Sequence, residues 1–168
     1  MKRSVLSVLF VLSISILPGQ AFSNEDLEAA ENLFNAQEYK KAVKHLKEVT
    51  KKDPSNTRGW VLMGDSYSSW GKHKQAVKAY EKALELDASQ KDALIGMGMS
   101  YGNMKKYGEA IVPLKHLVEI EPSNALAHFY LGVSYEALRS MNMAWEEYKI
   151  LKTLDKDLAD KLYHIIFW

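Results

Sequence analysis

The apolar residues of this chain stand at helical spacings, and the pattern itself returns every 34 residues. The clearest unit is residues 57–90, in which small and apolar side chains recur at Trp60, Met63, Gly64, Tyr67, Ala76, Tyr80 and Ala83. Residues three and four apart lie on one face of an α-helix. The unit therefore predicts two helices with apolar faces, and Gly71 supplies the turn between them.

Four units carry this pattern in phase, without insertion or deletion. The small residue at the eighth position is Ala30, Gly64, Gly98 and Gly132, and the residue three positions later is Leu33, Tyr67, Tyr101 and Tyr135. A small residue lets a second helix approach the first closely. One helix pair cannot bury its apolar face alone, so neighbouring pairs are expected to stack and to bury it for one another.

This pattern resembles the tetratricopeptide repeat family, and the resemblance covers nearly the whole chain after its first 22 or so residues. It implies an all-α, right-handed superhelical solenoid of four helix pairs with a C-terminal capping helix. The repeats are expected within residues 24–158, at about 23–56, 57–90, 91–124 and 125–158, and the cap at 159–168. Leu158, Leu162, Ile165 and Ile166 are expected to lie on one apolar stripe of the capping helix.

Several helix ends can be predicted from single residues. The first helix is expected to start near Asn24 or Glu25, and its partner to run from Tyr39 to Lys52. Asn56 or Ser55 is expected to cap the third helix. Pro113 lies inside a predicted helix, where it predicts a kink rather than a shortened helix. The register places six aromatic residues in the core, at Trp60, Tyr67, Tyr80, Tyr101, Tyr135 and Tyr148.

Residues 1–23 have the composition of a cleavable export signal. Lys2 and Arg3 are followed by an apolar run from Val5 to Leu17, and small residues precede the expected cleavage after Ser23, with Ala21 as the second choice. The run is short for a bilayer-spanning helix, which needs about 20 apolar residues. An uncleaved anchor and a buried first helix are the alternatives. The signal predicts an exported protein, periplasmic or secreted, with no stable membrane span after cleavage.

Charge and composition exclude several kinds of partner and site. The chain has 22 Lys and Arg against 21 Asp and Glu, a net charge of +1 that falls to about −1 without Lys2 and Arg3. This balance gives no overall attraction to nucleic acid or to anionic membranes, so no nucleic-acid partner is expected. The absence of cysteine excludes disulfides, thiol catalysis and thiolate metal sites.

Three patterns that resemble catalytic or metal sites are explained by the repeat. Residues 98–102 spell the nucleophile elbow of serine hydrolases, but Ser100 would lie inside a helix rather than on a strand-to-helix turn. Met97 and Met99 are two residues apart and point in different directions on a helix. The five histidines show no metal-binding spacing and are expected at the surface or near helix ends. We expect no enzyme activity, no cofactor and no metal.

The resemblance also implies a partner-binding groove, because tetratricopeptide proteins line a concave face with fixed positions of each first helix. Transferred by repeat position, these residues are Leu27, Phe34, Arg58, Val61, Asp65, Ile95, Met99, Asn103, Leu126, Phe129 and Val133. Five of them, Ile95, Met99, Leu126, Phe129 and Val133, are expected to form one apolar patch away from the core, which is typical of a binding site. Arg58 is the only cation in the set, so a lysine clamp for a partner's terminal carboxylate is not expected.

The function predicted from these residues is that of a non-enzymatic adaptor or scaffold in the cell envelope. It would hold a peptide or a helix of a partner protein in the concave groove. The alternative is a self-associating scaffold, a homo-oligomer in which the groove is occupied by another copy of the chain. The apolar patch could also be covered by the capping helix of the same chain.

Overall fold

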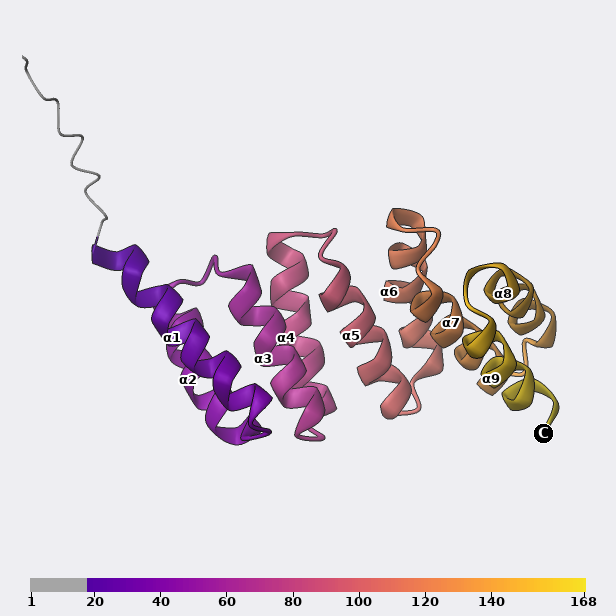
Figure 1. Ribbon diagram of the computed structural model, residues 1–168, viewed down its shortest axis with the longest axis horizontal. Coiled ribbons are helices and arrows are strands. Elements are labelled where there is room, and N and C mark those ends of the chain that lie inside the picture. The colour runs from indigo at the N-terminus through magenta and orange to yellow at the C-terminus, as the bar shows by residue number, and fades with distance from the viewer. Residues whose placement is uncertain (1–17) are drawn as a thin grey trace, which may run out of the picture.

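The computed structural model describes residues 18–168, and its side chains from residue 25 onward. Most of the predicted leader lies outside this range. Residues 18–168 form nine α-helices and no strand, with these bounds: α1 Pro18–Asn35, α2 Tyr39–Lys52, α3 Thr57–Ser69, α4 His73–Leu86, α5 Lys91–Asn103, α6 Tyr107–Ile120, α7 Ala125–Ala137, α8 Met141–Leu154 and α9 Lys156–Phe167. The helices follow one another in a row from the indigo to the yellow end of Figure 1.

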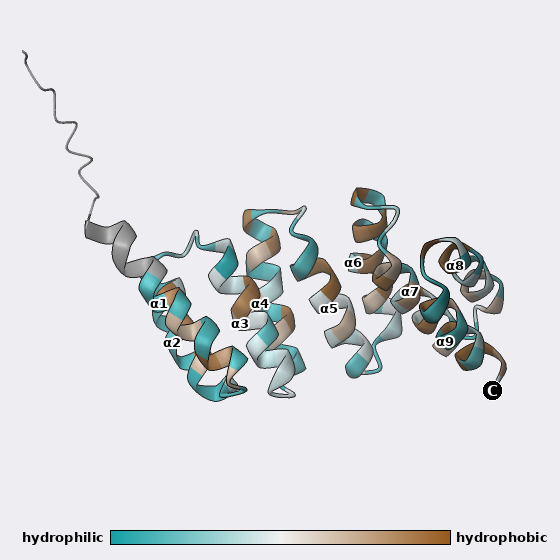
Figure 2. Ribbon diagram, viewed as in Figure 1, coloured by the Kyte–Doolittle hydropathy of each residue, from teal (hydrophilic) through white to brown (hydrophobic). Residues whose placement is uncertain are grey.

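The helices pack as four antiparallel pairs and a cap, as predicted. Each pair (α1 with α2, α3 with α4, α5 with α6, α7 with α8) is in contact, and each second helix also contacts the first helix of the next pair. The first helices α1, α3, α5 and α7 contact one another in series, and α9 continues the series after α7. They therefore share one face of the stack. Most helices carry both hydrophobic and hydrophilic stretches (Figure 2), as expected for elements with one buried side.

Helix starts and turns repeat with the sequence period. Asn56 caps α3 as predicted, since its side-chain oxygen accepts a 2.8 Å hydrogen bond from the Gly59 amide. Asn124 and Asp155 cap α7 and α9 in the same way. The turn inside each pair needs one residue with positive φ, and Gly71 is that residue in the second pair. The other pairs use Gln37, Lys105 and Arg139, each with φ near 60°.

The core is built where a side chain enters the gap beside a small residue. Ala42, Ala76, Ala110 and Ala144 are almost completely buried at equivalent positions of the second helices. An added Cβ atom on Gly64 would lie 2.4 Å from the Tyr80 ring, and one on Gly98 would lie 2.6 Å from Leu114. Such distances leave room for hydrogen only, so the eighth position controls how closely each pair approaches.

The last unit departs from this rule at Gly132. An added Cβ atom on Gly132 would lie 2.4 Å from Leu162 of α9, so the nearest side chain comes from the capping helix and not from α8. Tyr148 is partly buried, as Trp60, Tyr67 and Tyr101 also are, and it packs against the core cluster of α8 and α9 as well as against Trp145 and Tyr163. The capping helix thus contributes the residue that fills the gap in α7.

Two predicted helix starts are wrong. A third helix, which contains Pro113, shows that the proline does not shorten it. Helix α1 begins at Pro18, six residues before Asn24, and proline suits a first helical position because its missing N–H would have no partner there. Helix α9 begins at Lys156 rather than at residue 159, after the Asp155 cap. Helix α6 contains Pro113 and has 14 residues, the same length as α2, α4 and α8, so the proline does not shorten it.

His128 is buried in the first turn of α7, at the register position that belongs to the core set with Leu131 and Tyr135, so it lies near a helix end but not at the surface. Its Nδ1 atom lies 2.7 Å from a Glu147 carboxylate oxygen and its Nε2 atom 2.9 Å from the Pro122 carbonyl oxygen. Burial raises the pKa of Glu147, and the hydrogen bond to His128 lowers it in part. The pair links α7 to α8 at the position that holds Trp60 in α3.

A pair of glycine variants in α5 tests the packing rule. Gly98→Ala should reduce the free energy of unfolding by about 1–3 kcal/mol, because the buried Leu114 side chain cannot move away from the new methyl group. Gly102→Ala should raise it by about 0.5–1 kcal/mol, since nothing lies within 4 Å and alanine favours a helix. Urea denaturation measures both. Equal effects of the two variants would contradict the assigned register.

Candidate partner-binding groove

The shared face of the first helices contains a pocket between α1, α3 and α5. Its volume is about 310 Å³, and it is lined by Glu31, Phe34, Asn35, Arg58, Val61, Leu62, Asp65 and Asp92. Most of these residues come from the first half of α3 and the end of α1. We call it the acidic pocket, because three of its four charged residues are carboxylates.

Asp65, a side chain of the acidic pocket, is hydrogen-bonded by a residue of the core. Tyr80 of α4 is 1% exposed, and its hydroxyl donates a 2.7 Å hydrogen bond to Asp65 of α3. The ring can pass between α3 and α5 because both helices have glycine there: an added Cβ atom on either Gly64 or Gly96 would lie 2.4 Å from it. A core residue thereby fixes the position of a groove carboxylate.

Burial affects the acidity of both groups in this hydrogen bond. It raises the pKa of Asp65, an effect that the Tyr80 hydrogen bond opposes and the nearby Asp92 charge reinforces. Burial and the Asp65 charge also raise the pKa of Tyr80, so the phenol keeps its proton and donates a hydrogen bond to the carboxylate. The arrangement holds a carboxylate in a partly desolvated place.

The one cation of the acidic pocket is already paired. Arg58 forms a 2.6 Å salt bridge with Glu31. Asp65 and Asp92 have no ion-pair partner among residues 25–168. The pocket therefore keeps two uncompensated carboxyl groups, which favour a positively charged group from another molecule.

A second pocket on the same face lies between α5 and α7. It has a volume of about 230 Å³ and is lined by Gly98, Met99, Gly102, Asn103, Tyr107, Tyr130, Val133 and Ser134. Met99 is 38% exposed, and glycine at residue 102 leaves space beside it. This apolar pocket lies one repeat further along the chain than the acidic pocket.

Seven of the eleven predicted groove residues line these two pockets. Phe34, Arg58, Val61 and Asp65 belong to the acidic pocket, and Met99, Asn103 and Val133 to the apolar pocket. Leu126 is exposed and lines a different depression beside α9, together with Leu158 and Lys161. Ile95 is partly buried against the core clusters around Leu94 and Leu114.

The predicted geometry is wrong for three residues. Leu27 and Val61 are only 6% and 7% exposed and belong to core clusters, although Val61 reaches the acidic pocket. Phe129 packs against Leu151, Ala159 and Leu162, so the capping helix covers it in part. The reason is that α9 takes the place of a next first helix beside α7. The five expected apolar residues therefore do not form one uncovered patch.

Sequence reasoning missed Tyr130 and Tyr107 as groove residues. Tyr130 stands at the sixth position of its unit, where the equivalent residues are Leu62 and Gly96. Its ring lies edge-on to Phe129, with 5.4 Å between centroids, and it lines the apolar pocket. The small Gly102 in the facing helix was the available signal, because it leaves space that an aromatic side chain can border.

Ser100 does not occupy a nucleophile elbow. It lies inside α5, its side chain is fully buried, and its hydroxyl donates a 3.4 Å hydrogen bond to the Ser68 hydroxyl. An elbow serine must instead be exposed on a strand-to-helix turn. Within residues 18–168, none of the helices has both the length and the apolar character needed to cross a bilayer.

Comparison with known protein families agrees with the geometry. The family described as the cytochrome c-type biogenesis protein H TPR domain matches residues 17–159, which is most of the chain. The chain belongs to this tetratricopeptide (TPR) family. No curated protein matches its sequence.

Solved structures resemble the TPR stack at low sequence identity. MamA from Desulfovibrio magneticus RS-1 is 19% identical with a TM-score of 0.75, over 85% of this chain and 90% of that one. YrrB, described as a TPR protein with an unusual peptide-binding site, is 19% identical with a TM-score of 0.74, over 84% and 72%. The first TPR of Spaghetti (RPAP3), bound to the HSP90 peptide SRMEEVD, is 22% identical with a TM-score of 0.68, over 70% and 93%. These likenesses confirm the fold.

The raised pKa of Asp65 predicts a pH-dependent gain in stability for Asp65→Asn. Ionisation is less favourable in the folded than in the unfolded chain, so the wild type loses stability as pH rises through the folded-state pKa. Asparagine still accepts the Tyr80 hydrogen bond and carries no charge. The variant should therefore unfold at higher urea than wild type at pH 7, and the difference should vanish below about pH 4.

Asp87→Asn is the matched control, because the pKa of Asp87 is shifted in the opposite direction and the expected change in stability is also opposite. Hydrogen bonds from the Ser89 hydroxyl and amide lower the pKa of Asp87, so its charge favours the folded state. The variant should be less stable than wild type at pH 7. A loss of stability in Asp65→Asn at pH 7 would contradict the assigned burial of the Asp65 carboxylate.

Proposed function

We propose that this TPR protein is a non-enzymatic adaptor that binds a segment of a partner protein along its first helices. The segment carries a basic side chain for the acidic pocket and apolar side chains for the apolar pocket. The observation that carries the proposal is the pair Asp65 and Asp92, which share a pocket without an ion-pair partner among the described residues.

Two features of the groove support a peptide rather than a small molecule as ligand. The acidic pocket lies between α1, α3 and α5, and the apolar pocket lies between α5 and α7. A ligand that fills both pockets must therefore be extended along the stack. The structures similar in fold include a TPR domain bound to a peptide and a TPR protein described by its peptide-binding site. Rigid helices can present such a surface with little loss of conformational entropy on binding.

Photo-crosslinking in cells of the source organism tests the proposal. A benzophenone amino acid in place of Met99, which is exposed in the apolar pocket, should crosslink to another protein. The same group in place of Glu119, exposed on α6, should not. Asp92→Lys should reduce the Met99 crosslink about tenfold or more, because it places a like charge beside the basic side chain.

The crosslinked products decide between the proposed adaptor and its alternative. A product of two copies of this chain would favour the self-associating scaffold. Equal crosslinking from the Met99 and Glu119 positions would contradict a groove on the first helices. Circular dichroism should show unchanged helix content in Asp92→Lys, since Asp92 is exposed.

We also propose that the protein acts outside the cytoplasm, on the basis of residues 1–23. Cleavage after Ser23 would remove the first six residues of α1 and leave Leu27 and Ala30, which belong to the first core cluster. The native protein should have an intact mass that begins at Asn24. A native mass that includes residues 1–23 would contradict export by a cleaved signal.

A further inference from the structure

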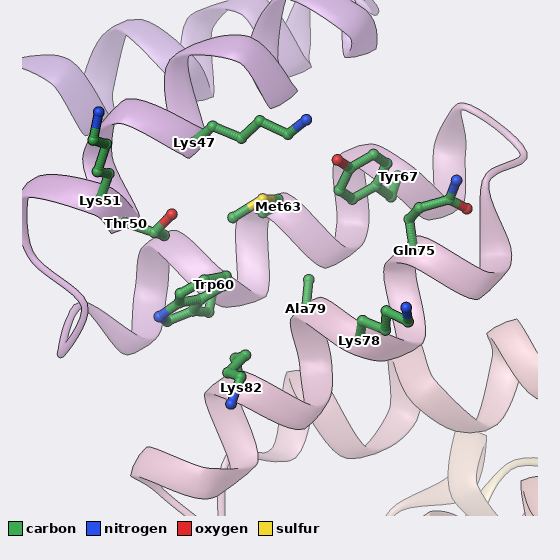
Figure 3. Close-up of a pocket in the computed structure, with 10 residues that line it drawn as sticks. All are labelled: Lys47, Thr50, Lys51, Trp60, Met63, Tyr67, Gln75, Lys78, Ala79 and Lys82. Carbon is green, nitrogen blue, oxygen red and sulfur yellow. The ribbon is translucent and has the colours of Figure 1, made fainter.

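A larger pocket lies on the other side of α3, between α2 and α4 (Figure 3). Its volume is about 470 Å³, and its lining includes Trp60, Met63, Tyr67 and Ala79 with four lysines, Lys47, Lys51, Lys78 and Lys82. Trp60, Met63 and Tyr67 stand about half a helical turn from Arg58, Val61 and Asp65 of the acidic pocket. We call it the lysine groove.

Two polar side chains in the floor of the lysine groove are hydrogen-bonded inside the protein. The Trp60 indole nitrogen donates a 2.9 Å hydrogen bond to the Pro54 carbonyl oxygen. The Thr50 hydroxyl donates a 2.9 Å hydrogen bond to the Leu46 carbonyl oxygen. The floor therefore offers mainly hydrocarbon and aromatic surface to a ligand.

The lysines stand on both walls of this apolar floor. Lys47 and Lys51 are four residues apart on α2, and Lys78 and Lys82 four apart on α4, so each pair follows its helix for one turn. Lys82 pairs with Glu85, but the other three have no ion-pair partner among residues 25–168. An apolar floor between two cationic walls is complementary to an apolar stripe between two acidic edges.

The other repeats show that the stack does not require this arrangement. One repeat later, the positions of the four lysines hold Glu81, Glu85, Val112 and His116. The position of Thr50 holds the larger Leu84 one repeat later and then Val118, which has the size of threonine, and both pack against the core clusters. Thr50 therefore leaves space that a leucine would fill, and the lysine groove is cationic only in the first junction between repeats.

We propose that the lysine groove binds an amphipathic helix of a partner protein. Leucine-type side chains of the helix lie on the partly buried rings of Trp60 and Tyr67, and glutamates or aspartates along both edges of the stripe meet the lysines of α2 and α4. A helix in a groove is a common recognition mode, with charges at the edges that set orientation and on-rate. An amphiphile with a single headgroup would engage one wall and leave the other unused.

A designed peptide tests this second site in the full chain. The probe is a fluorescein-labelled helix of about 18 residues with a leucine stripe flanked by glutamates, and its twin has glutamine at each glutamate. Fluorescence anisotropy should show binding of the glutamate peptide and at least tenfold weaker binding of the twin. Raising the salt from about 50 to about 500 mM should weaken the glutamate peptide more than the twin.

Three variants localise the binding. Lys47→Gln with Lys78→Gln should lose tenfold or more in affinity for the glutamate peptide. Lys115→Gln with Lys156→Gln removes the same charge, and Lys115 stands at the position of Lys47 two repeats on, so this control should bind like wild type. Thr50→Leu changes no charge but should fill the groove as Leu84 does one repeat later, and it should also lose tenfold or more.

Each contrary result overturns the proposal in a definite way. Equal binding of the twin, equal loss in the control variant, or full binding by a folded Thr50→Leu chain would exclude this groove as the site. Binding of phosphatidylglycerol vesicles without the peptide would assign the lysines to a lipid surface, and a lysine-dependent dimer in light scattering would assign them to a second copy. Asp92→Lys should leave peptide binding unchanged, so this result is independent of the concave groove.

Discussion

The close approach of paired helices at one small residue is the constraint on which the stack depends. Side chains as different as Tyr80, Leu114 and Leu162 fill the gaps beside Gly64, Gly98 and Gly132, each at a distance that excludes a methyl group on the glycine. Because interiors are packed to nearly crystalline density, a larger residue at these sites must move a helix rather than a side chain. One turn of each first helix thus sets the spacing of the whole row.

The same contact joins the core to the groove. The Tyr80 ring needs glycine on both sides, from Gly64 of its own pair and Gly96 of the next, and only then does its hydroxyl reach Asp65. The cost of holding a carboxylate in a partly desolvated place is offset only in part by that hydrogen bond. The most buried aromatic of the second repeat therefore also fixes a charge that faces a ligand.

Much of the fold could be predicted because its signals are local and periodic. The four pairs, the bounds of α2, the Asn56 cap and the Gly71 turn all follow from residue types at fixed spacing. Positive φ at Gln37, Lys105 and Arg139 could not be read from residue type, since the surrounding helices impose it.

The candidate site was harder to predict, because register gives the direction of a side chain but not what covers it. Leu27 and Phe129 point as the repeat requires, yet the first is buried in the core and the second lies partly under α9. In the last repeat, Leu162 of the cap and not a residue of α8 lies nearest to Gly132. Such departures concentrate at the ends of a repeat stack, where the neighbour on one side is not a repeat.

Net charge conceals the strongest electrostatic feature of the molecule. Helix α1 carries Glu25, Asp26, Glu28 and Glu31 without a basic residue, whereas α2 carries six lysines and one glutamate. Summed over the whole chain, these opposite charges cancel, and the net charge predicts no attraction to an anionic partner. Around α3, Asp65 and Asp92 give the acidic pocket its charge on one side, and the lysines of α2 and α4 form the lysine groove on the other. Exposed charges act over roughly a Debye length, about 8 Å at physiological salt, so an approaching ligand responds to the nearer face rather than to the sum.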